Sequence, residues 1–234
     1  MAKMNEPKGA PVVEETISAQ EAFFVKYKKA IITSAVALLV IVAGVILYYN
    51  YVYVPEENEA STALARGEQY MEMGDYEHAL KGDGANYKGF IAIADNYSST
   101  DAGNLANLYA GLCYAHLQKP DWKNALKYVK EFDTSDDMII SPASQMALGD
   151  IYANNNQLDD AVSSFKKAAK MADSEAADNT NNSVSPLALR KAGIILESQG
   201  KKADAHDIYT EIKKKYVNSA AYQDIDKYIE RTAN

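Results

Sequence analysis

The sequence predicts an all-α protein: a transmembrane helix near the N-terminus, then an α-solenoid of helical hairpins, then a closing helix. Three observations support this fold class. An uncharged run extends from Ala30 to Tyr49, a spacing typical of αα-hairpins recurs along the chain, and a last apolar stripe at helical spacing follows Val217. We expect a cytoplasmic tail at 1–29, a transmembrane helix at 30–53 and an extracytoplasmic domain at 56–234.

The uncharged run has the length and composition of a membrane span. At about 1.5 Å of rise per residue, a helix from Ala30 to Tyr49 reaches about 30 Å, which is the thickness of the hydrocarbon core of a bilayer. The run is apolar on every face, whereas a soluble helix usually has one apolar stripe. Pro55 is expected to end this helix.

Charges on either side of the span predict its orientation. Basic residues precede the run and the acidic residues Glu56, Glu57 and Glu59 follow it, so the positive-inside rule puts the N-terminus in the cytoplasm. Tyrosines at the exit end suit the headgroup layer, and a glycine leaves a small face for helix packing. The predicted anchor residues are Lys26, Lys28, Lys29, Gly44, Tyr48 and Tyr49.

A cleaved signal peptide is the alternative for this segment. The apolar region of a signal peptide is usually about 7–15 residues long and its leader is short. Here the apolar run is longer, 29 residues precede it, and the nearest A-x-A-like site, Ala63-Leu64-Ala65, lies beyond three glutamates. A retained anchor is therefore favoured.

The tail before the span contains a short amphipathic pattern. Thr16 can cap a helix that carries Ile17, Phe23, Phe24 and Tyr27 toward the membrane. Two interpretations remain open: an interfacial helix that continues into the span, or a cytoplasmic segment that docks on a membrane complex.

A repeated spacing organises the rest of the chain. A small residue is followed by a large residue three positions later, then by a turn residue, and then by an alanine in the next helix. The copies lie near 60–100, 104–135, 142–174 and 186–216, and a closing helix is expected at 218–232. Their first glycines are Gly67, Gly111, Gly149 and Gly193, and their alanines are Ala79, Ala125, Ala161 and Ala205.

The spacing has a physical reason in an αα-hairpin. The glycine lets the second helix approach the first closely, and Gly74, Asn156 or Gly200 supplies the turn. The third copy resembles the tetratricopeptide repeat family most closely, because Leu148, Gly149, Tyr152, Ala161, Phe165 and Ala168 fall in register. The copies depart from that family at its Trp position, which is filled by Ala63, Asn107, Gln145 and Leu189.

The resemblance implies a groove lined by the first helix of each hairpin. Such a groove would suit an extended or helical apolar peptide with some positive charge; alternatively, several of its residues pack against the inserted loops. Acidic and apolar residues at these positions argue against a carboxylate clamp, and so against an import receptor of that kind. The implied groove residues are Leu64, Glu68, Met71, Leu108, Leu112, His116, Met146, Asp150, Asn154, Arg190, Ile194 and Glu197.

The tail, span and acidic repeat domain together are similar to single-pass tetratricopeptide proteins of the bacterial inner membrane that sit beside the Sec translocon and cooperate with periplasmic chaperones. That resemblance implies a non-enzymatic adaptor whose partners are translocon subunits, periplasmic chaperones or envelope clients. A scaffold subunit of an envelope or cell-wall complex is the alternative. An unrecognised hydrolase or metal protein is a third hypothesis, and the oligomeric state stays open.

Composition and motifs limit the chemistry. A net charge of −8 argues against binding a nucleic-acid backbone. The single cysteine, Cys113, is expected to be a buried structural thiol, and His78, His116 and His206 have no metal-binding spacing. Asp83 and the acidic cluster at Asp173 resemble calcium loops only faintly. We therefore expect no cofactor, no metal and no catalytic residues.

Overall fold

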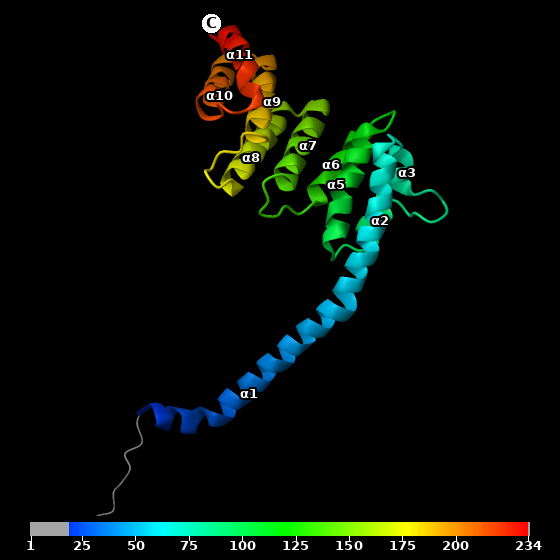
Figure 1. The fold of residues 1–234 in the computed structure, drawn as a ribbon, viewed down its shortest axis with the longest axis vertical. Coiled ribbons are helices and arrows are strands. Elements are labelled where there is room, and N and C mark those ends of the chain that lie inside the picture. Colours follow the sequence, from blue (N-terminus) through cyan, green and yellow to red (C-terminus); the bar gives the residue numbers. More distant parts are fainter. Residues whose placement is uncertain (1–18, 234) are drawn as a thin grey trace, which may run out of the picture. The chain divides into compact units, whose positions relative to one another are not determined.

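A computed structural model describes residues 19–233, with side-chain surroundings from residue 23 onward. Over these residues the protein is all-helical and contains no strand (Figure 1), which confirms the all-α prediction. The chain divides into two compact units, residues 1–52 and residues 53–234.

The first unit is a long apolar helix. Helix α1 spans Ala19–Tyr48 and is followed by the π-helical segment η1, Tyr49–Tyr53. Over the described residues, one helix is long and apolar enough to cross a membrane, and its most apolar stretch has a mean hydropathy of 2.9. Side chains such as Leu39 and Ile41 are exposed, as expected of a helix whose apolar surface is covered by lipid.

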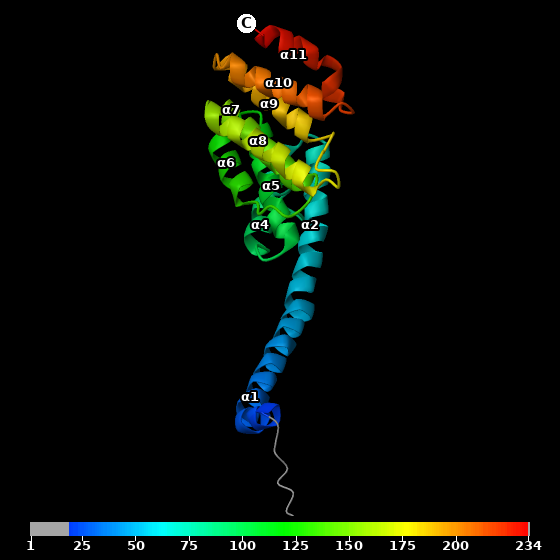
Figure 2. The ribbon, with the colours of Figure 1, turned by 90° about the vertical axis from the view of Figure 1, so that its left-hand side faces the viewer.

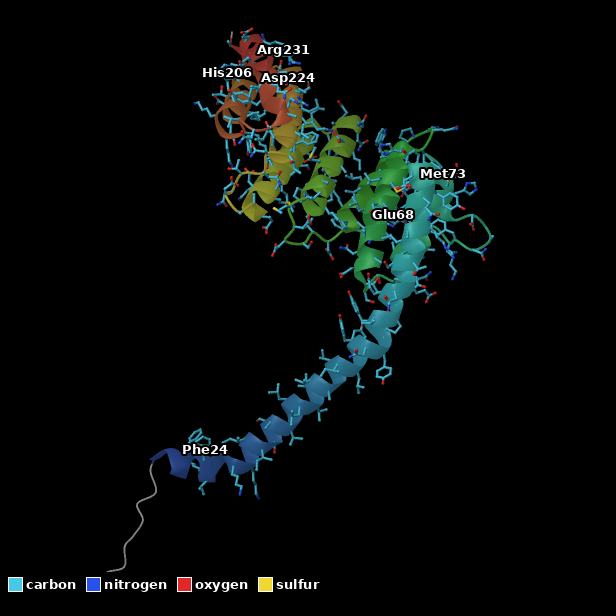
Figure 3. All side chains as sticks on the ribbon, viewed as in Figure 1. Phe24, Glu68, Met73, His206, Asp224 and Arg231 are labelled. Carbon is cyan, nitrogen blue, oxygen red and sulfur yellow. The ribbon has the colours of Figure 1, made fainter. Side chains whose placement is uncertain are left out.

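The amphipathic pattern of the tail is described only in part. Thr16 and Ile17 lie outside the described residues. From Ala19 the helix runs unbroken into the apolar run. The ring of Phe23 lies 5.9 Å from that of Phe24 and 4.8 Å from that of Tyr27. Figure 3 labels Phe24 on this helix.

Pro55 does not end the helix, so that prediction was wrong. Helix α2 begins at Val54 and continues to Glu72, with Pro55 in its first turn. Proline is tolerated at this position because the first N–H groups of a helix have no partner within the helix. The wider π turn of η1 ends at Tyr53, directly before the first residue of α2.

The second unit consists of helices that follow one another along the chain, each packed on its neighbours (Figure 1). After α2 come α3 (Tyr76–Lys81), α4 (Phe90–Asn96), α5 (Asp101–His116), α6 (Trp122–Glu131), α7 (Ile140–Asn154), α8 (Leu158–Glu175), α9 (Ser185–Ser198) and α10 (Lys202–Lys215). The 3₁₀ segment η2 (Ala220–Asp224) and α11 (Ile225–Thr232) follow, and α11 packs on α10.

The turns inside the helix pairs use residues with positive φ. Gly74 and Gly200 have φ of 74°, and Asn156 has φ of 59°. Glycine and asparagine adopt this left-handed conformation more easily than other residues. The prediction that these three residues supply the turns is therefore confirmed.

Close approach of paired helices is confirmed at Gly111, Gly149 and Gly193. At Gly67 the nearest atoms belong to Tyr87 and Phe90, which lie beyond the second helix of its hairpin. A Cβ atom at Gly149 would lie 2.6 Å from the Phe165 ring, and one at Gly193 would lie 2.4 Å from the Tyr209 ring. The aromatic ring of the second helix thus occupies the space that a side chain on the first helix would need.

The core is a series of local apolar clusters. One lies among α2–α6 and includes Leu80 and Phe90; the next lies among α5–α7 and includes Val129. The last lies among α8–α11 and includes Phe165 and Tyr209. Each cluster is shared by helices close in sequence, so the fold is built mainly from short-range packing.

Candidate functional site

A pocket lies where α5, α6 and α7 meet. Its volume is about 190 Å³, below the range of about 300–1,000 Å³ that is usual for small-molecule sites, so it suits one inserted side chain better than a cofactor. We call it the α5–α7 pocket. It is lined by Leu112, Ala115 and His116 of α5, Trp122 of α6, and Ala147, Asp150, Ile151 and Asn154 of α7.

Trp122 is placed by the cap of its helix. Asp121 precedes it and accepts hydrogen bonds from the backbone N–H and the side-chain amide of Asn124, at 3.0 and 2.7 Å. These bonds hold the pKa of Asp121 below its usual value. The cap fixes the first turn of α6, and with it the half-buried indole at the pocket wall.

His116 provides a polar group beside these apolar walls. Its Nδ1 lies 2.8 Å from the carbonyl oxygen of Leu112. Because a carbonyl oxygen only accepts, Nδ1 must carry the proton, which leaves Nε2 of the neutral ring as an acceptor. His116 is exposed, so that acceptor is open to a hydroxyl or ammonium group of a ligand.

The rim of the pocket carries an ion pair. Lys191 of α9 donates to both carboxylate oxygens of Asp150 at 2.7 Å, and the amide of Asn154 donates to the carbonyl oxygen of Asp150 at 2.8 Å. The charge of Asp150 is therefore balanced by Lys191, and the pocket offers one acceptor, one ion pair and apolar walls.

The pocket unites four of the implied groove residues, Leu112, His116, Asp150 and Asn154. Two others belong to the core: Leu64 is 7% exposed and Leu108 is 5% exposed, which corrects their placement in the lining of a groove. Both lie three residues before a key glycine, and this position faces the neighbouring helices.

Three further groove residues are engaged inside the domain. Glu68 accepts a hydrogen bond from Tyr109 at 2.8 Å. Arg190 pairs with Asp224 at 3.3 Å, and Glu197 pairs with Arg231 at 2.7 Å; both partners come from the C-terminal segment (Figure 3). These side chains hold helices together, which limits their part in binding a ligand.

The remaining three groove residues differ in exposure. Met71 and Met146 are partly buried against apolar clusters, whereas Ile194 is exposed. None of the three lines the α5–α7 pocket.

Sequence reasoning missed the role of Trp122 in the pocket. It is the only tryptophan of the chain and follows Pro120 in the turn of the second hairpin, where packing alone also favours a large apolar residue. Ala115, Ala147 and Ile151 have no polar chemistry that marks them. Their convergence depends on how α5 crosses α7, which single-helix spacing does not report.

The acidic residues that resemble calcium ligands have internal partners. Asp83 accepts backbone N–H bonds from Ala85, Asn86 and Tyr87 through Oδ1, and these bonds lower its pKa to about 2. Among residues 19–233 no group of three or more His, Cys, Asp or Glu side chains could hold a metal ion.

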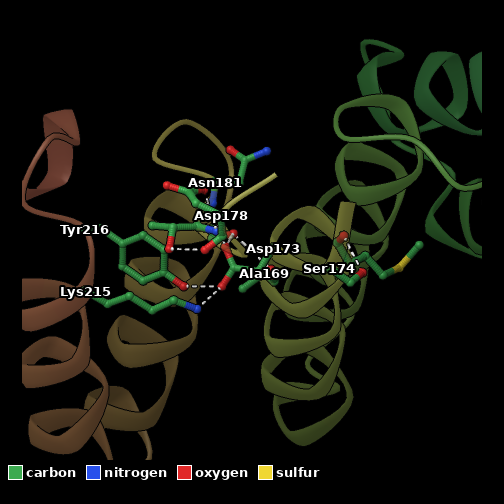
Figure 4. A network of polar contacts seen from close by, with 10 residues as sticks. Ala169, Asp173, Ser174, Asp178, Asn181, Lys215 and Tyr216 are labelled. Carbon is green, nitrogen blue, oxygen red and sulfur yellow. Dashed lines mark hydrogen bonds and ion pairs between the residues drawn. The ribbon is translucent and has the colours of Figure 1, made fainter. Parts of the chain in front are cut away.

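Asp173 ties together three helices and a loop (Figure 4). Its Oδ1 accepts from Ser185 Oγ at 2.6 Å and from Asn181 N–H at 2.8 Å, and its Oδ2 accepts from Tyr216 Oη at 2.6 Å and from Lys215. Partial burial alone would raise the pKa of the Asp173 carboxyl, but the bonds from Lys215, Ser185 and Tyr216 outweigh it, so the pKa is lowered.

We expect Asp173→Asn to destabilise the domain by about 2–3 kcal/mol, because it removes the charge from a nearly buried network. Denaturant unfolding measures this effect. Asp178→Asn, in the loop that follows α8 and with an exposed side chain, is the control and should change stability little. The pKa of the Asp173 carboxyl is lower in the folded state than in the unfolded state. Its contribution to folding stability is therefore present above the unfolded pKa of about 3.9, and it is lost as the pH falls through the folded pKa. Equal stability of the two variants would contradict the role of Asp173.

Cys113 is fully buried, as predicted. Burial raises the pKa of its thiol to about 12, so little reactive thiolate exists near neutral pH. His78 bonds to Asp75 at 2.7 Å and His206 lies 3.3 Å from Thr232, while His116 lines the pocket described above.

The comparison with protein families corrects the resemblance inferred from sequence. Residues 115–223, from the end of α5 to η2, match the family described as suppressor of spindle checkpoint defect 1 C-terminal domain. This is not a tetratricopeptide family, so the assignment of the chain to tetratricopeptide proteins, and to their translocon-associated bacterial class, was wrong. The small–large spacing that led to it is needed by any tightly packed helical hairpin.

No curated protein matches the chain. The family match covers less than half of the chain. It therefore establishes similarity to this family over residues 115–223 and no further.

Proposed function

We propose that this chain is a single-pass membrane protein whose helical domain binds segments of other proteins without catalysing a reaction. In this proposal the tail is cytoplasmic and the domain lies on the opposite side of the membrane. The lysines before the apolar run and the glutamates after it support that orientation.

The main support for the proposed binding function is the α5–α7 pocket. It has apolar walls, a single tryptophan and an exposed histidine acceptor, and its volume suits one large apolar side chain. Aromatic residues and partly open pockets of this kind often form the centre of a protein interface. A ligand segment would insert an apolar side chain beside Trp122 and place a hydroxyl or ammonium group near His116.

The order of the helices supports the same function. If the helix pairs form a solenoid, the first helices of successive pairs provide a continuous surface on either side of the pocket. Tethering to a membrane raises the local concentration of the domain, so weak contacts on this surface become effective. Translocon subunits and periplasmic chaperones are not proposed as partners, because they followed only from the tetratricopeptide resemblance, which the family match contradicts.

A scaffold that holds one fixed partner is the second candidate. Met138, Ile139 and Ile140 are consecutive apolar residues with exposed fractions of 48%, 65% and 47%. An exposed apolar run is more typical of a permanent interface than of a transient one. The scaffold would form a long-lived complex with its partner, whereas the first candidate would bind protein segments transiently.

Photocrosslinking tests the proposal. A photoreactive residue at Asn154, in the pocket wall, should yield discrete crosslinks to protein when the full chain is in its native membrane. Ala147→Leu fills the pocket and should lower the yield about tenfold, a loss of about 1.4 kcal/mol in binding. Ala143→Leu makes the same change at an exposed site on α7 and should leave the yield unchanged. Equal yields in the two variants, or no crosslinks, would reject the pocket as a protein-binding site.

A further inference from the structure

A second hollow lies on α9 between α8 and α10. Both α8 and α10 pack on α9 (Figure 2), and the hollow between them has a volume of about 670 Å³. We call it the α8–α10 groove. Its lining includes Leu189 from α9, residues of α8 and residues of α10, and it shares no residue with the α5–α7 pocket.

Charges of opposite sign line the two walls of this groove. Lys166 and Lys170 lie on α8, and Asp204, Asp207 and Glu211 lie on α10. Spacings of four residues on α8, and of three and four on α10, place each set along one face of its helix. All five side chains are exposed.

The two rows do not neutralise one another. Among the described side chains, no ion pair joins a lysine of the α8 row to a carboxylate of the α10 row. Elsewhere in this half of the domain, Lys201, the N-cap of α10, pairs with Asp159 of α8, and Lys213 of α10 pairs with Asp226 of α11. The separated rows leave both signs of charge available to a ligand that enters between them.

The floor between the rows is apolar, and one end is closed. Leu189, Ile208 and Tyr216 line it and are buried, so they offer a shallow apolar contact. The Asp173 network with Lys215 and Tyr216 closes the end near the α8–α9 loop (Figure 4). A ligand would therefore be recognised mainly through its two charged edges.

We propose that the α8–α10 groove binds an α-helical segment of a partner protein that carries one acidic and one basic edge. The acidic edge would face Lys166 and Lys170, and the basic edge would face the α10 carboxylates. Lys166 and Lys170 are about 6 Å apart along their axis, which matches residues one turn apart on a bound helix. Reversing the bound helix would place both edges against like charge, so the groove fixes its direction.

Stapled helical peptides test this inference. Three fluorescent peptides share one apolar stripe and differ in their edges: acidic and basic, both basic, or both acidic. Anisotropy is measured with the full chain in detergent micelles. The two-edged peptide should bind at least about tenfold more tightly than either other peptide, although the net charge of −8 would otherwise favour the doubly basic one.

The variant Lys166→Glu/Lys170→Glu makes both walls acidic and provides the decisive comparison. Its preference should switch to the doubly basic peptide by about tenfold. Both changes are at exposed helix positions, and circular dichroism checks that the domain stays folded. Three results would overturn the inference: wild type preferring the doubly basic peptide, an unchanged preference in the variant, or no binding at about 1 mM peptide.

Two further readouts separate this groove from other sites. Trp122 lies in the α5–α7 pocket, so its emission should not change when a peptide fills the α8–α10 groove. A change in Trp122 emission would place the peptide in the pocket and reject the groove. Self-association that is lost in the double variant, without peptide binding, would assign the groove to a second copy of the chain and overturn the proposal of a partner helix.

Discussion

Gly111→Val should destabilise the domain by about 3–5 kcal/mol, a large share of the stability of a typical domain. A Cβ atom at Gly111 would lie 2.4 Å from Val129 Cγ2, 2.8 Å from Val129 N and 3.0 Å from the carbonyl oxygen of Ala125. Two of these atoms are backbone atoms of α6, so side-chain rotation cannot relieve the clash. The two helices would have to separate. Denaturant unfolding of the full chain in micelles measures the loss.

Ala65→Val is the matched control. It adds a β-branched side chain at an exposed position of α2, and its expected effect is within about 0.5 kcal/mol. If Gly111→Val were as stable as this control, α5 and α6 would not pack as closely as the structure indicates.

The second large effect concerns the apolar run that we propose as a membrane anchor. Leu39→Arg/Ile41→Arg should oppose membrane insertion by about 6–8 kcal/mol, because each arginine near the centre of a span costs about 2.5–3.5 kcal/mol and a favourable apolar residue is also lost. The protein should then become extractable from membranes by alkaline carbonate, whereas the wild type should resist extraction.

Leu39→Ala/Ile41→Ala is the control for position, since it shortens the same side chains without adding charge. This variant should remain in the membrane fraction. Retention of the double-arginine variant after carbonate extraction would contradict the assignment of this run as the anchor.

Much of the fold follows from local sequence rules. Gly74, Asn156 and Gly200 mark turns because few residues tolerate positive φ, and Gly149 and Gly193 mark close approach because a neighbouring ring fills their Cβ space. These requirements act within one hairpin, so they can be read from one stretch of sequence. The mistaken family assignment has the same origin, because unrelated tight hairpins obey the same local rules.

The parts that were missed depend on less local geometry. Pro55 was read as a helix end, but the π turn before it lets the helix restart at Val54. Leu64 and Leu108 were placed in a groove, although neighbouring helices cover them. The pocket around Trp122 arises from the crossing of α5 and α7, and no spacing within either helix encodes that crossing.

We propose above that the α5–α7 pocket of a membrane-anchored domain binds a protein segment. Fluorine NMR of the full chain, with fluorotryptophan at its only tryptophan, would detect such binding at the pocket itself. The purified protein captured by crosslinking from Asn154 serves as titrant. We expect a saturable change of the Trp122 resonance in wild type and in Ala143→Leu, and no change in Ala147→Leu. A resonance that stays unchanged in wild type at saturating titrant would contradict it.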